Sequence, residues 1–99
     1  MENIVPTNKE TILEEAARLT HYDRNSQYGH PLHDFSRTAK MWEAILNKEN
    51  ITPEQVAMCM IAVKLSRLCN SIKRDSIVDI AGYANTIDMV IDKKKETML

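Results

Sequence analysis

The hydrophobic positions of the chain recur at the three- and four-residue spacing of amphipathic helices. From this periodicity we predict four helices, over residues 8–21, 31–47, 53–69 and 73–93. The chain contains no internal repeat, low-complexity tract or linker, so residues 1–99 are predicted to form a single helical domain. The expected fold class is all-α, a four-helix bundle-like arrangement without a sheet.

Two capping boxes mark where helices are expected to begin. Thr7 and Glu10 have the spacing of an N-cap residue and its N3 partner before the first stripe. Thr52 and Gln55 repeat that spacing, and Pro53 lies between them at the first helical position, which suits a residue without an N–H. The start of the third helix is therefore the clearest boundary in the sequence.

The third predicted helix contains the longest apolar run. All eight residues of Val56–Val63 are apolar, which indicates a helix that is buried on every side. A 99-residue monomer with three other helices has too little surface to cover one helix completely. We therefore predict that helix 53–69 is the most buried and that it takes part in the interface of a homo-oligomer.

Composition and charge exclude several classes of partner. The 2 glycines and 3 prolines are few for an all-β chain. The 13 basic and 14 acidic residues nearly cancel, which argues against binding to duplex DNA or RNA. The longest apolar run is far shorter than the ~20 residues of a membrane span, and no signal peptide is visible. Cys59 and Cys69 are predicted to be free thiols, which favours a cytoplasmic location.

Four charged residues flank the turn between the third and fourth predicted helices. With Ser71 at the centre of the turn, Lys64 should lie level with Asp79, and Arg67 with Asp75. One interpretation is that two ion pairs lock the hairpin. The other is that the cations bind phosphates while the carboxylates hold a divalent cation such as Mg²⁺.

A second polar cluster occupies residues 22–30, which are predicted to form a loop. Arg24 can clamp a phosphate and Tyr28 can stack on a base. Gly29 allows close backbone approach, and His30 precedes a helix N-terminus, which favours an anion. The alternative is an ordinary connection between two helices.

Several motifs resemble a family of small phage proteins of unassigned function. The Lys-x-x-Arg and Asp-x-x-x-Asp-Ile-Ala-x-Tyr elements also resemble a phage nucleotide-modification-associated domain. Both are distantly similar to the MazG-like all-α nucleoside triphosphate pyrophosphohydrolases. The motifs are Tyr28-Gly29-His30-Pro31, Thr52-Pro53-Glu54-Gln55, Lys64-Leu65-Ser66-Arg67-Leu68 and Arg74-Asp75-Ser76 with Asp79-Ile80-Ala81-Gly82-Tyr83-Ala84.

The distant resemblance implies an oligomeric helical protein that binds Mg²⁺ and cleaves nucleotides to monophosphate and pyrophosphate. In that superfamily an EExxE helix faces an ExxD helix. Here Asp75 and Asp79 take the place of ExxD with one additional residue between them, and the chain has no EExxE. Lys64 and Arg67 are expected where the facing carboxylates would lie.

Basic residues in place of catalytic acids favour binding without turnover. We therefore predict a phage oligomer, in the host cytoplasm, that sequesters a nucleotide or cyclic nucleotide, including one that serves as an immune signal. The alternative is a MazG-like Mg²⁺-dependent pyrophosphohydrolase, with Asp75 and Asp79 as metal ligands supplemented by Asp34, Glu43 or a neighbouring subunit. The predicted ligand-binding residues are Arg24, Tyr28, His30, Lys64, Arg67 and Tyr83.

Overall fold

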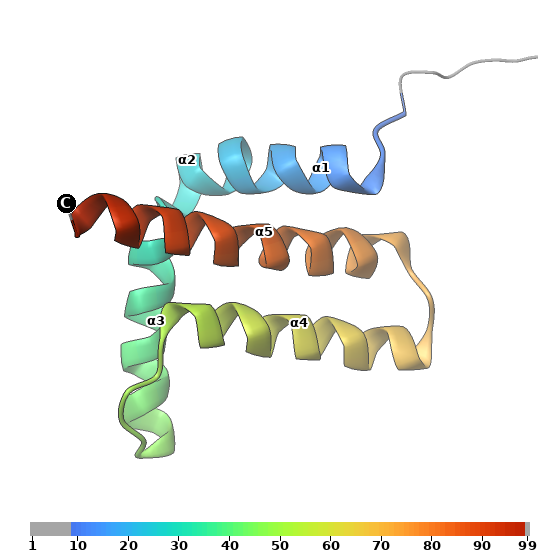
Figure 1. The fold of residues 1–99 in the computed structure, drawn as a ribbon. Helices are drawn as coiled ribbons and strands as arrows, with labels where there is room; N and C mark the ends of the chain where they lie inside the picture. Colours follow the sequence, from blue (N-terminus) through green and yellow to red (C-terminus); the bar gives the residue numbers. More distant parts are fainter. Residues whose placement is uncertain (1–8, 99) are drawn as a thin grey trace, which may run out of the picture.

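The computed structural model describes residues 9–98, and every regular element in them is helical (Figure 1). This confirms the predicted all-α class. Within the described residues, no helix combines the length and apolar character needed to cross a membrane. The elements in chain order are α1 (Ile12–Arg18), the π-helical turn η1 (Leu19–Asp23), α2 (Arg24–Tyr28), α3 (Pro31–Leu46), α4 (Pro53–Asn70) and α5 (Arg74–Thr97).

The first helical segment is longer than the sequence indicated. α1, η1 and α2 follow one another without a break, so the prediction of a loop over 22–30 is wrong for residues 22–28, and only Gly29 and His30 connect two helices. Most polar residues of this stretch are exposed, which composition alone does not distinguish from a loop, whereas Arg24 and Asn25 are partly buried. The helix ends at Gly29, whose φ of 80° a residue with a side chain rarely adopts.

The helix starts are set by capping boxes, one of them at an unexpected place. Thr7 lies outside the described residues. The box of the first helix is formed one turn later: Thr11 Oγ1 accepts from the N–H of Glu14, and a Glu14 carboxylate oxygen accepts from the N–H of Thr11. The predicted box at the start of α4 is confirmed by the same reciprocal bonds between Thr52 and Gln55.

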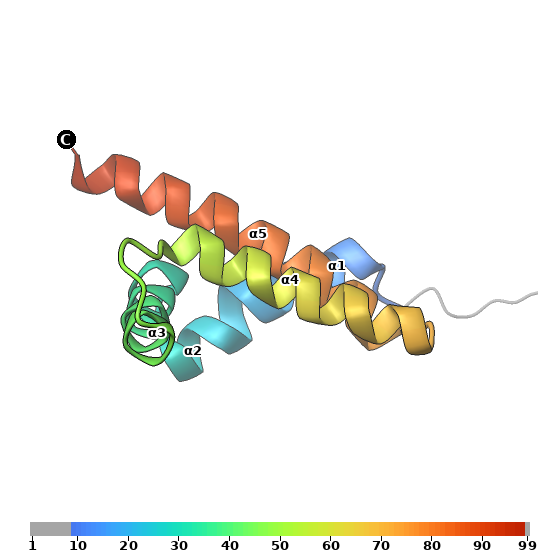
Figure 2. The same ribbon diagram turned by 90° about the horizontal axis from the view of Figure 1, so that it is seen from below.

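The longest helix, α5, lies at the centre of the fold. α1 and α4 lie on either side of it, and α3 runs across the layer (Figure 1). Seen along the layer, α2 and α3 lie on one side of the α4–α5 pair, and no helix of the described chain covers the other side (Figure 2). The core forms where α3 meets α4 and α5. It contains Phe35, Ala39, Val56 and Ala57, with Trp42, Ile51, Tyr83 and Ile87 packed against them.

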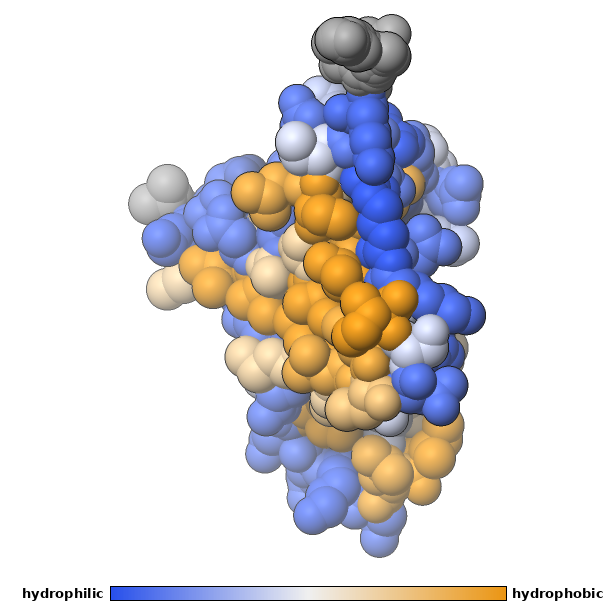
Figure 3. Space-filling view, turned by 90° about the vertical axis from the view of Figure 1, so that its right-hand side faces the viewer, coloured by the Kyte–Doolittle hydropathy of each residue, from blue (hydrophilic) through white to orange (hydrophobic). Residues whose placement is uncertain are grey.

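The single chain leaves most of α4 accessible. Only Val56 and Ala57 of this helix are buried, whereas six residues of α5 are buried. The prediction that helix 53–69 is the most buried is therefore wrong for the single chain, because the central position belongs to α5. The space-filling view in Figure 3 shows a broad continuous apolar area on the surface.

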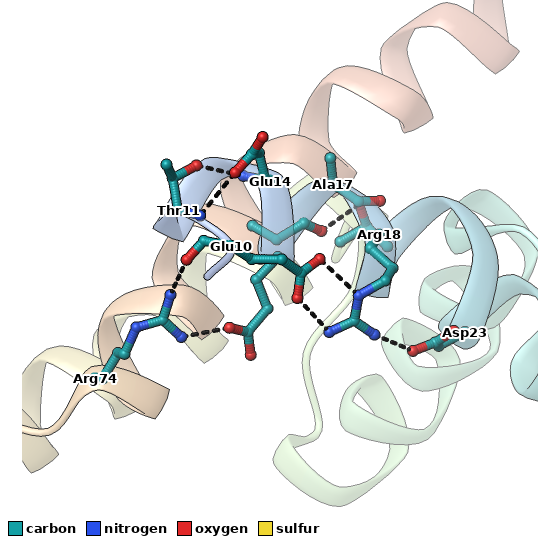
Figure 4. A network of polar contacts seen from close by, with 10 residues as sticks. Glu10, Thr11, Glu14, Ala17, Arg18, Asp23 and Arg74 are labelled. Carbon is teal, nitrogen blue, oxygen red and sulfur yellow. Dashed lines mark hydrogen bonds and ion pairs between the residues drawn. The ribbon is translucent and has the colours of Figure 1, made fainter. Parts of the chain in front are cut away.

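A network of charged side chains fastens α1 to the start of α5 (Figure 4). Arg18 donates to both carboxylate oxygens of Glu10, at 2.9 and 3.0 Å, and to Asp23 at 2.9 Å. Arg74 pairs with Glu15 and donates to the carbonyl oxygen of Glu10. The hydrogen bonds from Arg18 lower the pKa of Glu10 below its ordinary value. The network holds the N-terminal end of α5 next to α1.

A second ion pair joins the start of α4 to the end of α5. Both carboxylate oxygens of Glu54 accept from Lys94 Nζ at 2.9 Å. Partial burial, the largest single influence, raises the pKa of Glu54, but the hydrogen bonds from Lys94 and from the backbone, together with the positive charge of Lys94, outweigh it and the resulting pKa is lowered. A carboxylate with a lowered pKa in the folded state stabilises the protein above its unfolded pKa and loses that contribution as the pH falls.

We expect Glu54→Gln to flatten the acid dependence of stability. The wild type should lose about 0.5–1 kcal/mol of unfolding free energy from this pair below about pH 4.5, and the variant should lack that increment. Urea unfolding followed by circular dichroism between pH 7 and pH 3 measures the difference. Glu49→Gln, a change at an exposed residue, is the matched control. Identical pH profiles for the wild type and Glu54→Gln would contradict this assignment.

Candidate functional site

A cavity of about 330 Å³ lies between the first helical segment and α5. We call it the inner cavity. Three of the predicted ligand-binding residues line it, together with one of the predicted metal ligands. Its lining includes Arg24, Tyr28, Asp79, Gly82, Tyr83 and Thr86. The fold thus brings together residues that are about 60 positions apart in the chain.

The π-helical turn η1 forms part of the cavity wall. Thr20 is buried, and its hydroxyl donates to the carbonyl oxygen of Ala16 at 2.9 Å while accepting from Asn85 Nδ2 at 2.8 Å. On the facing helix, a Cβ added to Gly82 would lie 3.4 Å from Thr20 Cγ2. That distance is an ordinary van der Waals contact, so α5 lies directly against η1 at Gly82. Single π-helical turns occur frequently at functional sites.

Arg24 is held between a carboxylate and two aromatic rings. Its Nη2 donates to Asp34 at 2.6 Å. Its guanidinium carbon lies 4.6 Å from the ring centre of Phe35 and 5.4 Å from that of Tyr28. Its Nε is buried and has no hydrogen-bond partner among the described residues. The side chain is thus fixed in place while one of its donors stays unused.

A second hollow, of about 450 Å³, lies at the turn between α4 and α5. We call it the outer hollow. Lys64 Nζ lies 2.9 Å from Asp79 Oδ2, as predicted for residues at the same level of the hairpin. Asp79 also lines the inner cavity, so the two spaces share this residue. The charged residues of the outer hollow are Lys64, Arg67, Lys73, Asp75 and Asp79.

The outer hollow favours an anion. Its three cations and two carboxylates give a formal charge of 3 − 2 = +1. The 24-residue helix α5 begins here, and its N-cap residue Lys73 makes no capping hydrogen bond with its side chain. The first N–H groups of a helix attract negative charge, and a helix without a side-chain cap leaves these groups to solvent or to a ligand.

The second predicted pair of the hairpin does not form. Arg67 and Asp75 both line the outer hollow, yet the described structure contains no ion pair between them. Both side chains are exposed, and an exposed ion pair contributes little against hydration and side-chain entropy. Arg67 thus borders the hollow with its charge available.

Comparisons with known proteins place this chain in a family. Residues 11–91 match the family model described as "Domain of unknown function (DUF6378)". The chain belongs to the DUF6378 family. It is 41% identical over 88 residues to the Gene 55 protein of Mycobacterium phage D29 and 35% identical over 79 residues to the Gene 55 protein of Mycobacterium phage L5.

The aligned regions cover 88% and 79% of this chain but 58% and 51% of the two relatives. The chain therefore spans little more than half the length of the curated relatives that it matches. No solved structure matches the chain significantly. The resemblance to a family of small phage proteins is confirmed at the level of the DUF6378 family.

In this DUF6378 chain, His30 lies outside both the inner cavity and the outer hollow. It is the N-cap of α3, and its Nδ1 accepts from the N–H of Leu32 at 3.0 Å. Burial lowers the pKa of His30, and the positive charge of Lys93 lowers it further, so the neutral ring that can accept this bond is favoured. The structure therefore gives His30 a capping role, and does not bring it to the other predicted site residues.

The carboxylates considered as supplementary metal ligands have other partners. Asp34 accepts from Arg24, and an oxygen of Glu43 accepts from the N–H of Ile51 at 3.0 Å. Neither one joins Asp75 and Asp79. Among residues 9–98, no three His, Cys, Asp or Glu side chains lie close enough together to hold a metal ion.

Sequence reasoning missed part of the lining in this DUF6378 chain. Gly82 was the available signal, because a glycine inside a helix costs about 1 kcal/mol relative to alanine and so points to a close approach. The absence of a capping side chain at Lys73 was a second signal. The lining residues that were not predicted include Leu19, Thr20, Asp23, Gln27, Lys73 and Thr86.

Proposed function

We propose that the chain binds a nucleotide and retains it without turnover, with phosphates in the outer hollow and the base in the inner cavity. Such a protein would sequester its ligand from other enzymes, including a cyclic nucleotide that acts as an immune signal. The observation that carries the proposal is that a basic hollow and a cavity lined by tyrosines share Asp79.

Charge and helix geometry support the placement of the phosphates. Lys64, Arg67 and Lys73 surround the N-terminal end of α5, where backbone N–H groups can add further donors. A guanidinium can bind two oxygens of one phosphate, and Arg67 has no ion-pair partner within the described chain. Without ligand, Asp79 neutralises Lys64, and a phosphate can replace that carboxylate as the partner of the lysine.

Aromatic and polar groups support the placement of the base. Tyr28 and Tyr83 line the inner cavity, and a tyrosine ring can stack on any base. The cavity of about 330 Å³ falls within the range of small-molecule sites. Asp79 also supplies carboxylate oxygens that can accept hydrogen bonds from a ribose or from an exocyclic amine.

Isothermal titration with a panel of nucleotides tests the proposal. The panel contains mono-, di- and triphosphates, cyclic mono- and dinucleotides, and inorganic phosphate and pyrophosphate as controls without a base. We expect at least one nucleotide to bind and to be recovered unchanged. Arg67→Glu should weaken that binding at least tenfold, because it reverses the charge beside the phosphates, and the loss should shrink at high salt.

Lys48→Glu is the matched control, since Lys48 is exposed and lies outside both spaces. It makes the same change in net charge and should leave affinity within twofold of the wild type. If Arg67→Glu and Lys48→Glu affect binding equally, the phosphates do not lie in the outer hollow. If no member of the panel binds, the proposal fails as a whole.

Hydrolysis is the second candidate function, favoured by the position of Asp75 and Asp79 on one side of α5 at the outer hollow. A single chain offers these two carboxylates there, and one of them pairs with Lys64. Metal-dependent hydrolysis requires ions that neutralise the reacting phosphoryl group, so further ligands would come from another chain or from the substrate. Release of pyrophosphate from nucleoside triphosphates with Mg²⁺ or Mn²⁺ would establish this alternative and exclude retention without turnover.

A further inference from the structure

The exposed side of α5 carries an apolar stripe. Ile77, Ala84 and Ile91 follow at intervals of seven residues and are all exposed, the two isoleucines by 38% and 39%. Residues spaced by seven lie on one side of a helix. No charged residue occurs between positions 80 and 87. The helix therefore presents an apolar strip to solvent over about two turns, from Ile77 to Ala84, and the exposed Asp88 separates this strip from Ile91.

The neighbouring helix carries a matching stripe. Met58, Ala62, Leu65 and Cys69 follow at spacings of four, three and four residues, and all four are exposed. Met58 and Leu65 expose 53% and 51% of their surface, and positions 55–63 contain no charge. We call the two stripes together the hairpin face.

The hairpin face lies on the side of α4 and α5 that no other helix of the described chain covers. Figure 2 shows α2 and α3 on the opposite side of this pair. Figure 3, which views the molecule from the end where α4 turns into α5, shows a continuous apolar area on the surface. Monomeric proteins rarely expose apolar patches of more than a few hundred Å².

The size of the hairpin face suits a protein partner. At 1.5 Å per residue the 18 residues of α4 extend for about 27 Å, and two packed helices are about 20 Å wide. Such a rectangle measures on the order of 500 Å² before the relief of the side chains is counted. A stable interface removes about 800 Å² per partner, so this face approaches the area that one subunit of a dimer needs.

The spacing of the two stripes suits a second copy of the chain as the partner. Apolar residues at intervals of three, four and seven pack best against helices with the same intervals, and a second hairpin face supplies two of them. A two-fold axis also requires a surface that is complementary to itself. The centre of the hairpin face meets this requirement because it is apolar and carries no charge to repel its copy.

We propose that two chains dimerise through their hairpin faces, so that α4 and α5 of each chain form a four-helix bundle. The inner cavity remains open in this dimer. Gly82 lines the inner cavity and lies two residues before Ala84, which places the two about 200° apart around α5. Each copy thus binds its ligand on the side that faces away from its partner.

Sedimentation equilibrium of the whole chain at 5–100 µM, a range of about twentyfold that brackets typical micromolar association, tests the dimer. We expect the wild type to have twice the chain mass of 11.4 kDa. Ala84→Glu should raise the dissociation constant at least a hundredfold, because dimerisation would bury an unpaired carboxylate. In a single chain this exposed residue contributes little to folding, so helicity should be retained.

The matched control is Ile45→Glu, an equally apolar-to-acidic change at a residue of α3 that is 77% exposed. It should leave the dimer intact. Leu65→Lys provides a second variant on α4, so that misfolding of one variant does not decide the outcome. A wild type that stays monomeric up to 100 µM overturns the proposal, as does a dimer that neither Ala84→Glu nor Leu65→Lys weakens more than Ile45→Glu does.

Discussion

Simultaneous replacement of Lys64 by Met and Asp79 by Leu is expected to abolish nucleotide binding and to leave the fold intact. The ion pair between these residues is partly exposed, with 15% and 38% of the two side chains accessible. Removing one partner strands the other charge, but exchanging both for apolar side chains of similar volume is often neutral for stability. We expect the free energy of unfolding to stay within about 1 kcal/mol of the wild type.

The expected loss of affinity is much larger, on the order of a hundredfold or more, because a charged hydrogen bond to a ligand contributes about 1.5–3 kcal/mol and two such groups are lost. Isothermal titration with the bound nucleotide measures it, and urea unfolding checks the fold. As a control, Lys93→Met with Glu96→Leu makes the same change of residue classes at a longer and more exposed ion pair, at 3.6 Å, outside the inner cavity and the outer hollow. If the Lys64/Asp79 double variant unfolds like the wild type and binds nucleotide equally well, the pair takes no part in ligand binding.

Phe35→Ala is expected to be the most destabilising single change. Phe35 is 3% exposed, packs against Tyr83 with ring centres 6.2 Å apart, and supports the guanidinium of Arg24. Removing a buried phenyl ring leaves a cavity and costs about 3–5 kcal/mol. That loss is a large share of the roughly 5–15 kcal/mol that stabilises a typical small domain.

Urea unfolding monitored by circular dichroism measures this loss. Met41→Ala, at a residue of the same helix that is 65% exposed, is the control and should change stability by less than about 0.5 kcal/mol. Phe35→Ala should also weaken ligand binding, since Arg24 and Tyr83 line the inner cavity. Equal stability of the two variants would show that the core does not centre on Phe35.

The sequence predicted the helical class and three of the four main helices to within a few residues, because capping boxes and apolar stripes are local signals. It failed where the outcome depends on contacts between distant segments. Residues 22–28 are polar enough to resemble a loop, but they continue the first helix from η1, which contacts α5, into α2, which contacts α3. The burial of α4 was overestimated because an apolar run does not reveal which helix takes the centre of a single chain.

The charge pattern of the hairpin could be read from the sequence because an antiparallel pair of helices places residues equally far from the turn at the same level. This logic predicted the contact between Lys64 and Asp79. It did not predict that Arg67 and Asp75 stay apart, since exposure decides between an ion pair and hydration. Nor did it reveal the inner cavity, which depends on a π-helical turn for which helical periodicity gives no signal.

The π-helical turn η1 also has a consequence for how this chain tolerates insertions and deletions. A π turn corresponds to one extra residue in an α-helix, and each residue of an α-helix advances the helix by about 100° and 1.5 Å. Loss of one residue between Leu19 and Asp23 would make the helix regular. The residues of α2 would then be rotated by about 100° around the helix axis. Arg24 and Tyr28 would then point away from Gly82 and Tyr83. The number of residues in η1, as much as their types, thus decides which side chains meet across the inner cavity.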